Sequence, residues 1–179
     1  MPVIKVGVLG ARGRMGSLVC DTVRSAEDLE FVAGVDVGDS LDALAGCDVV
    51  VDFTSPDVVM GNLHWCIEHG MSVVIGTSGF SESRLAQVRE LLRSTPDESE
   101  LPAASAPRVL VVPNFSVGAV LMMQFAEQAA RFFESVEIIE LHHAGKIDAP
   151  SGTAVRTAAM IAAARSAAGV GPSPDATTT

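Results

Sequence analysis

The residues best suited to chemistry lie in one segment, residues 137–153, which reads EIIELHHAGKIDAPSGT. It holds two adjacent histidines, His142 and His143, and Lys146, in a chain whose only other lysine is Lys5. Imidazole and ammonium groups can transfer protons near neutral pH when their surroundings adjust their pKa values. Such groups at the end of a strand, followed by a helix start, indicate a site for a dianionic small molecule.

The elements expected around these residues would position them. An apolar strand would send His142 and His143 to opposite sides, so that one of them can face a substrate. Ser151 is predicted to cap a helix, leaving the amides of Gly152 and Thr153 at the positive end of the helix dipole. That arrangement can bind an anion, and Gly152 permits a close approach. The alternative is a purely structural segment with surface histidines, which the nearby lysine and helix start disfavour.

A second signal lies near the amino terminus. Residues 10–16, GARGRMG, follow an apolar strand-like run at 3–9 and precede a run with helical spacing at 18–24. Strand, glycine turn and helix in this order are typical of a dinucleotide site, in which helix amides hold the pyrophosphate. The spacing by itself is a weak signal, because an ordinary turn between a strand and a helix can also contain glycines.

Asp36 strengthens this interpretation. It lies about 20 residues after Gly16, the spacing at which dinucleotide-binding sites of this type carry an acidic residue for the ribose. A carboxylate there can accept both hydroxyls of an adenosine ribose, which favours NADH. Arg12 and Arg14 argue partly the other way, since either could meet the 2′-phosphate of NADPH. A solvated aspartate after an ordinary strand remains the alternative.

Composition excludes several classes of protein. A formal net charge of −10 argues against nucleic-acid binding. The apolar runs are too short for a membrane span and no secretory leader is apparent, so we expect a cytoplasmic enzyme. Cys20, Cys47 and Cys66 lack metal-ligand spacing and are predicted to be buried thiols rather than disulfides or zinc ligands. No metal site is predicted.

The order of elements predicts an α/β fold with a doubly wound parallel sheet. Further strands are expected at 48–53, 72–75 and 108–112, with a helix from Ser55-Pro56 to Gly70 and another at 82–92. The carboxyl ends of parallel strands share one edge, where ligands bind. The turns after these strands contain small and polar residues that would hold a cofactor, although each alone could be a plain turn. No function is assigned to the proline-rich loop 93–107.

The character of the chain changes after residue 117. Leu121, Phe125, Ala129 and Phe132 repeat at helical spacing and are expected to face a core. A strand, the histidine segment and an alanine-rich helix at 151–168 follow, and the rest is a tail. We therefore predict a Rossmann-like domain at 1–117, followed by an incomplete α+β substrate-binding domain at 118–179.

These motifs resemble dihydrodipicolinate reductase (4-hydroxy-tetrahydrodipicolinate reductase), a family of bacterial lysine and diaminopimelate biosynthesis. The resemblance extends across essentially all 179 residues, including residues 137–154, the glycine turn, 52–54, 76–80 and 113–118. The HHxxKxDAPSGT run is highly specific, whereas the glycine turn is common to many reductases. The family reduces a cyclic, unsaturated dicarboxylate to tetrahydrodipicolinate with a nicotinamide cofactor, and its complete members are homotetramers.

The resemblance assigns roles by position. His142 would be the acid/base residue, Lys146 the proton donor and His143 a substrate contact, while Gly152 and Thr153 would bind a substrate carboxylate. The implied cofactor residues are Gly10, Ala11, Arg12, Gly13, Arg14 and Met15 for the pyrophosphate, Asp36 for the ribose, and Gly76, Thr77, Ser78, Val112, Pro113, Asn114 and Phe115 for the nicotinamide side.

The chain departs from the family pattern in three places. Ser78 replaces a threonine, and Val37 stands where some members carry an arginine for the 2′-phosphate, so NADH is favoured over NADPH. Family members also continue for several strands beyond Thr179, so we expect a truncated chain. It is either an active reductase or a cofactor-binding fragment that cannot catalyse. A different substrate, as in aspartate or homoserine dehydrogenases, is disfavoured because those relatives lack the HHxxK motif.

Overall fold

The computed structural model describes residues 2–94, 106–142, 144 and 149–171. The chain divides into two compact units, Met1–Val112 and Pro113–Thr179. The elements of the first unit are β1 Ile4–Leu9, α1 Arg14–Ser25, β2 Leu29–Val35, the 3-10 helix η1 Leu41–Leu44, β3 Val49–Asp52, α2 Val59–Glu68, β4 Ser72–Ile75, α3 Glu82–Ser94 and β5 Val109–Val111.

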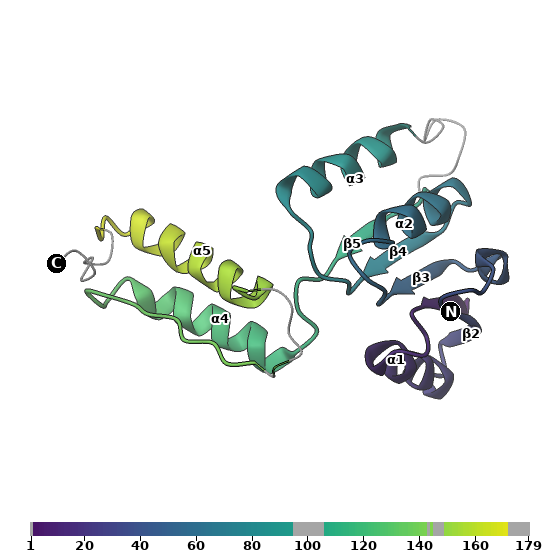
Figure 1. Cartoon of the computed structure of the whole chain (residues 1–179), viewed down its shortest axis with the longest axis horizontal. Coiled ribbons are helices and arrows are strands. Elements are labelled where there is room, and N and C mark those ends of the chain that lie inside the picture. The colour runs from purple at the N-terminus through teal and green to yellow at the C-terminus, as the bar shows by residue number, and fades with distance from the viewer. Residues whose placement is uncertain (1, 95–105, 143, 145–148, 172–179) are drawn as a thin grey trace. The chain divides into compact units, whose positions relative to one another are not determined.

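The sheet of the first unit has the strand order β2-β1-β3-β4-β5, and every neighbouring pair is parallel. Helix α1 lies on one face, whereas α2 and α3 lie on the other (Figure 1). The predicted doubly wound parallel sheet is confirmed. From β1 the chain continues to β2 on one side of β1 and then crosses over to β3 on the other side. The switch point of the sheet therefore lies between the carboxyl ends of β1 and β3.

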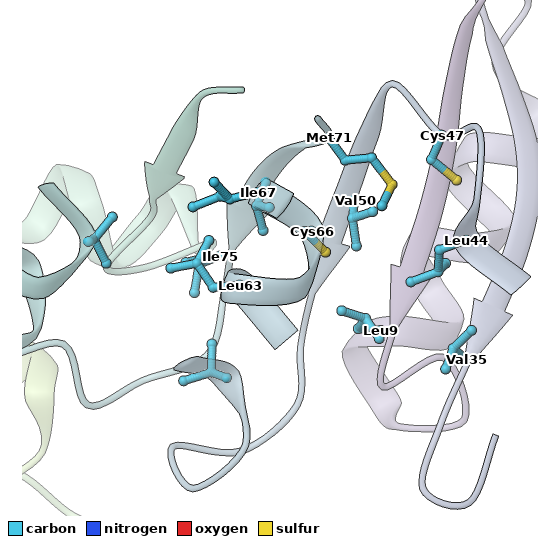
Figure 2. Close-up of a cluster of buried hydrophobic side chains, with 13 residues drawn as sticks. Leu9, Val35, Leu44, Cys47, Val50, Leu63, Cys66, Ile67, Met71 and Ile75 are labelled. Atoms are coloured by element: carbon cyan, nitrogen blue, oxygen red, sulfur yellow. The ribbon is translucent and has the colours of Figure 1, made fainter. Parts of the chain in front are cut away.

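The core of this unit forms between the sheet and α2 (Figure 2). Leu63 and Cys66 of α2, which are at most 1% exposed, pack in one cluster with Val50 and Ile75 of the sheet. Burying one such aliphatic side chain stabilises the fold by about 1.5–3 kcal/mol. The three cysteines, Cys20, Cys47 and Cys66, are buried and free, as the sequence predicted.

Helix α2 begins later than predicted. Its first residue is Val59, preceded by Val58 without a side-chain cap, and not Ser55-Pro56. The backbone oxygen of Ser55 accepts the amides of both Val58 and Val59, so the chain makes one turn before the helix starts. The predicted end is confirmed, because Gly70 has a φ of 73° and Met71 donates to Cys66 O beyond it.

The second unit contains α4 Val117–Ala130 and α5 Gly152–Ala167, which pack against each other (Figure 1). The strand expected before His142 is absent: no strand is assigned in the described residues of this unit. A strand needs a hydrogen-bonded neighbour, and the described part of the unit provides none. Among the described helices of the whole chain, none is long and apolar enough to cross a membrane.

The apolar stripe predicted on α4 does not face a core. Leu121, Phe125 and Phe132 are 42%, 62% and 75% exposed, and Phe132 lies beyond the end of the helix. The buried residues of α4 are instead Met123 and Ala130. Spacing predicted that one side of this helix is covered, but the position of α5 decides which side.

Candidate functional site

A cavity of about 490 Å³ lies in the first unit at the switch point of the sheet. Three turns at the carboxyl ends of β1, β2 and β3 line it, together with the start of α2. The lining includes Gly10, Gly13, Asp36, Val37, Gly38, Asp39, Phe53, Thr54, Ser55, Val58 and Asn62. Of the cofactor residues predicted from sequence, Gly10, Gly13 and Asp36 therefore line one cavity.

Two glycines make the turn before α1 possible. Gly10 has a φ of 76°, and a Cβ there would lie 2.5 Å from the backbone oxygen of Phe53. A Cβ on Gly16 would overlap the backbone oxygen of Gly10. Gly13 is less constrained, since its φ is −73° and its Cβ would lie 3.2 Å from that same oxygen. Gly10 and Gly16 thus shape the turn, whereas Gly13 borders the cavity.

The amides of this turn fall into two groups. Gly10 N and Ala11 N donate to Val35 O, Arg12 N donates to Asp36 Oδ2, and Gly13 N donates to Gly10 O. The amides of residues 14–16 belong to the first turn of α1, where no intrahelical acceptor exists. An anion at this helix end would therefore meet the amides of residues 14–16, at the positive end of the helix dipole.

Asp36 lies directly after β2, and two backbone amides bind its carboxylate. Arg12 N donates to Oδ2 at 2.8 Å and Val37 N donates to Oδ1 at 2.9 Å. These hydrogen bonds, first that of Val37 and then that of Arg12, lower the pKa of Asp36 below its usual value. The carboxylate stays ionised at neutral pH, and its remaining lone pairs can accept hydroxyl groups.

A buried carboxylate that sequence reasoning missed holds the turns after β3 and β4 together. Asp52 is 1% exposed. Its Oδ1 accepts from Thr54 N, Thr54 Oγ1 and Thr77 Oγ1, and its Oδ2 accepts from Asn62 Nδ2. A carboxylate that interrupts an apolar strand was the available signal. Fully bonded buried networks of this kind fix the positions of their members, here including Thr77.

The remaining residues predicted for the nicotinamide side belong to both units. In the first unit, Thr77 is buried and Ser78 is exposed. The ring of Phe53 occupies the space that a Cβ on Gly76 would need. In the second unit, Asn114 Nδ2 donates to Thr153 Oγ1 at 3.0 Å, which links two predicted site residues. The other members of the set, Ala11, Arg12, Arg14, Met15, Val112, Pro113 and Phe115, do not line the cavity of the first unit.

In the second unit, the predicted helix cap is confirmed. Ser151 Oγ accepts from Ala154 N at 3.1 Å, and α5 begins at Gly152. The amides of Gly152 and Thr153 lie in the first turn of α5, where N–H groups have no acceptor within the helix. No atom of the described residues would lie within 4 Å of a Cβ on Gly152, so they leave the space beside this glycine open.

Glu140 connects His142 to this helix start, a role that the sequence did not suggest. Its carboxylate accepts from Ser151 N at 2.9 and 3.2 Å and lies 3.8 Å from Nδ1 of His142. Its position two residues before His142, hence on the same face of an extended chain, was the available signal. His142 is partly exposed. His143 and Lys146 lie outside the described residues.

Comparisons with known proteins cover both units. A family model described as dihydrodipicolinate reductase, N-terminus, matches residues 4–97, and one described as dihydrodipicolinate reductase, C-terminus, matches residues 118–176. The chain is 60% identical over 178 residues to 4-hydroxy-tetrahydrodipicolinate reductase from Nocardia farcinica (strain IFM 10152), covering 98% of this chain and 68% of that protein. It is 56% identical over 174 residues to the protein of that name from Cutibacterium acnes (strain DSM 16379 / KPA171202), covering 97% and 67%.

Solved structures agree with these matches. The dipicolinate-bound dihydrodipicolinate reductase from Paenisporosarcina sp. TG-14 matches with a TM-score of 0.68 and 38% identity, covering 91% of this chain and 67% of that chain. A biliverdin reductase from Synechocystis sp. PCC 6803, solved with biliverdin and NADP⁺, matches with a TM-score of 0.51 and 15% identity, covering 72% and 42%. The second likeness concerns the fold alone.

Proposed function

Because this chain belongs to the dihydrodipicolinate reductase family of oxidoreductases, we propose that it reduces 4-hydroxy-tetrahydrodipicolinate to tetrahydrodipicolinate, in diaminopimelate and lysine biosynthesis, with NADH favoured over NADPH. The observation that carries the proposal is the start of α5. There the Ser151 cap leaves the amides of Gly152 and Thr153 available to a carboxylate, and Glu140 ties this helix start to His142.

The first unit fits a dinucleotide. Its cavity lies at the switch point, where the first turn of α1 offers amides to a pyrophosphate and the ionised Asp36 can accept the hydroxyls of a ribose. Asp52 would hold Thr77 in place on the nicotinamide side. When bound, a reduced nicotinamide supplies the hydride. The protein contributes the binding of the phosphates and the orientation of the ring.

The second unit supplies the groups for a cyclic dicarboxylate. One carboxylate would bind the amides of Gly152 and Thr153, with the Thr153 hydroxyl held by Asn114. His142 would provide or take up the proton that balances the charge left by hydride addition. Lys146 as proton donor and His143 as a substrate contact follow from the family resemblance and lie outside the described residues.

The substrate-binding domain would begin at residue 118, where the second family model starts, although the two compact units divide between Val112 and Pro113. Complete family members are expected to be homotetramers, and a cytoplasmic location is expected for the enzyme. Both remain predictions for this chain.

A second candidate function is cofactor binding without catalysis. The observation that favours it is the segment before His142, which forms no strand in the described part of the chain. Without a sheet to hold that segment, the substrate groups would lack the precise positions that catalysis needs, because a displacement of about 1 Å can cost about 100-fold in rate.

Titration of the 179-residue chain with NADH separates the two functions. Cofactor fluorescence would be followed with and without pyridine-2,6-dicarboxylate, a planar mimic of the substrate. We expect NADH to bind and the dicarboxylate to tighten that binding, because the proposal assigns the cofactor groups to the first unit and the carboxylate-binding groups to the second. If NADH binds and the dicarboxylate has no effect, the chain binds the cofactor without forming the substrate site. The absence of NADH binding would refute both functions.

A further inference from the structure

Asp39 makes two contacts at the edge of the cavity that the functions proposed so far do not use. Its Oδ2 accepts from Arg12 Nη2 at 2.8 Å and from the amide of Asp36 at 2.9 Å. Arg12 in turn donates its own amide to Asp36 Oδ2, and its Nε lies 3.9 Å from that oxygen. Arg12, Asp36 and Asp39 therefore form a closed set of contacts at the end of β2.

We propose that Asp39 is a specificity-determining residue that makes this chain prefer NADH, because it holds the Arg12 guanidinium and adds a negative charge where the 2′-phosphate of NADPH would lie. The inference rests on the proposed function, which places the adenosine ribose at Asp36. It extends that function from the carboxylate of Asp36 to a second acid and to the basic side chain between them.

The charges around Asp36 support this inference. Two carboxylates share one guanidinium, so the set carries one net negative charge. A ribose diol is neutral and donates hydrogen bonds to a carboxylate, so this environment suits it. A 2′-phosphate brings further negative charge and would have to draw Arg12 away from Asp39. Val37, which is 94% exposed beside Asp36, has no side-chain donor to offer in its place.

The geometry also explains why Arg12 by itself does not make the site select NADPH. Its guanidinium is bound by Asp39, and Nη2 also donates to Val37 O at 3.4 Å. The pair is partly exposed, with side chains 64% and 40% accessible, so the ion pair contributes little to stability. The ion pair instead determines whether the Arg12 guanidinium is available to the 2′-phosphate of NADPH.

Replacement Asp39→Asn tests the proposal, since asparagine keeps an oxygen acceptor for the Asp36 amide and removes the charge. Dissociation constants of NADH and NADPH would be measured by cofactor fluorescence with the 179-residue chain. We expect NADPH to bind about five- to tenfold more tightly in the variant, the size of one unit charge a few ångströms away in a largely aqueous site. NADH binding should change by less than about twofold.

A matched control is Asp42→Asn, which removes an equal charge nearby. Asp42 contacts Ser40 and neither Arg12 nor Asp36. It should leave both dissociation constants unchanged. In addition, Arg12→Gln should abolish the gain of Asp39→Asn when the two are combined, because the freed guanidinium produces that gain.

Several results would overturn the proposal: a wild-type chain that prefers NADPH, an Asp39→Asn variant whose two affinities change equally, or an Asp42→Asn variant that behaves as Asp39→Asn does. If Asp39→Asn lowers the Tm and obscures binding, Asp39→Ser keeps a hydroxyl acceptor and is judged in the same way. A wild-type chain that binds neither cofactor would refute the proposed function itself, whereas NADH binding without any effect of Asp39 would refute this inference alone.

Discussion

At the scale of single residues, Gly13 and Gly16 in the turn before α1 have different roles. Gly16 packs so closely on the backbone of Gly10 that it has no room for a side chain, whereas Gly13 has an ordinary φ and borders the cavity. The first should therefore matter for folding and the second for binding.

Substituting these two glycines separates folding from cofactor binding. Gly16→Ala should lower the free energy of unfolding by about 1–3 kcal/mol, because the turn must shift to admit the methyl group. Gly13→Val should cost about 1 kcal/mol as a poorer helix cap, yet weaken NADH binding at least about tenfold by filling the approach of the pyrophosphate. Thermal unfolding and NADH titration measure both effects. Unchanged NADH affinity in Gly13→Val would refute the role of the glycine turn.

Gly152 offers a comparable test in the second unit. Because a Cβ at this position would meet no atom of the described residues within 4 Å, Gly152→Ala should leave the Tm unchanged or slightly higher, since alanine favours the helix. The methyl group would nevertheless obstruct a carboxylate approaching the helix amides. We expect pyridine-2,6-dicarboxylate to lose most of its effect on NADH binding. If that effect is retained, the carboxylate does not bind at the start of α5.

His142 is the described residue to which we assign proton transfer. His142→Gln keeps the polarity and approximate size of the side chain but removes its ability to transfer a proton near neutral pH. Turnover should fall by about 100-fold or more, the usual contribution of general acid–base catalysis, while the dissociation constant of NADH stays the same. A large loss of NADH affinity would place this residue in the cofactor site instead.

At the scale of elements, the packing of α4 on α5 depends on a buried arginine. Arg165 of α5 is 4% exposed and donates to the backbone oxygens of Ala130, Phe133, Glu134 and Gly171. Three of these oxygens lie at or just after the carboxyl end of α4, where carbonyl groups lack intrahelical donors and a cation is favoured. The Arg165 side chain of α5 thus caps the carboxyl end of α4.

Arg165→Met should therefore destabilise the second unit by about 3 kcal/mol or more, because four backbone carbonyl groups, among them that of the buried Ala130, lose their charged donor. Arg156→Met is the matched control, since Arg156 lies on the same helix and is exposed; its effect should stay within about 0.5 kcal/mol. Chemical denaturation followed by circular dichroism measures both. Equal effects of the two substitutions would show that the contacts of Arg165 are not important for stability.

At the scale of the whole molecule, the buried thiols make the free energy of unfolding depend on pH in the alkaline range. Burial, with smaller contributions from the charge of Asp52 and from Cys47, raises the pKa of Cys66 to about 12 from a usual 9.0. Burial also raises the pKa values of Cys20 and Cys47. Above pH 9 the unfolded chain loses these protons while the folded chain keeps them, so stability falls as pH rises.

The free energy of unfolding should therefore decrease between pH 9 and pH 12, with a contribution from Cys66 on the order of a few kcal/mol. Below pH 9 this contribution is fully present and constant. Cys66→Ala should be less stable at about pH 7, because it leaves a cavity, but its stability should decline less steeply at alkaline pH. Urea denaturation at several pH values gives both slopes, and parallel slopes would contradict the assignment.

Much of the fold could be predicted from the sequence because the signals are local. The strand at 72–75 and the capped helix after Ser151 were placed correctly, since strand composition and a serine cap act within a few residues. The start of α2 and the exposed face of α4 were predicted wrongly. The start of α2 depends on which backbone oxygen accepts the amides of Val58 and Val59. The buried face of α4 depends on where α5 packs against it.

The sequence by itself determined the family, the parallel α/β architecture and the two polar segments of the proposed site, because motif, period and cap are properties of neighbouring residues. Only the tertiary structure decided that Asp52 binds Thr77, that Glu140 joins His142 to Ser151, and that Asp39 holds Arg12. The contacts of Asp52 with Thr77, of Glu140 with the Ser151 amide and of Asp39 with Arg12 join separate elements or turns, and their distances are set when the elements pack together.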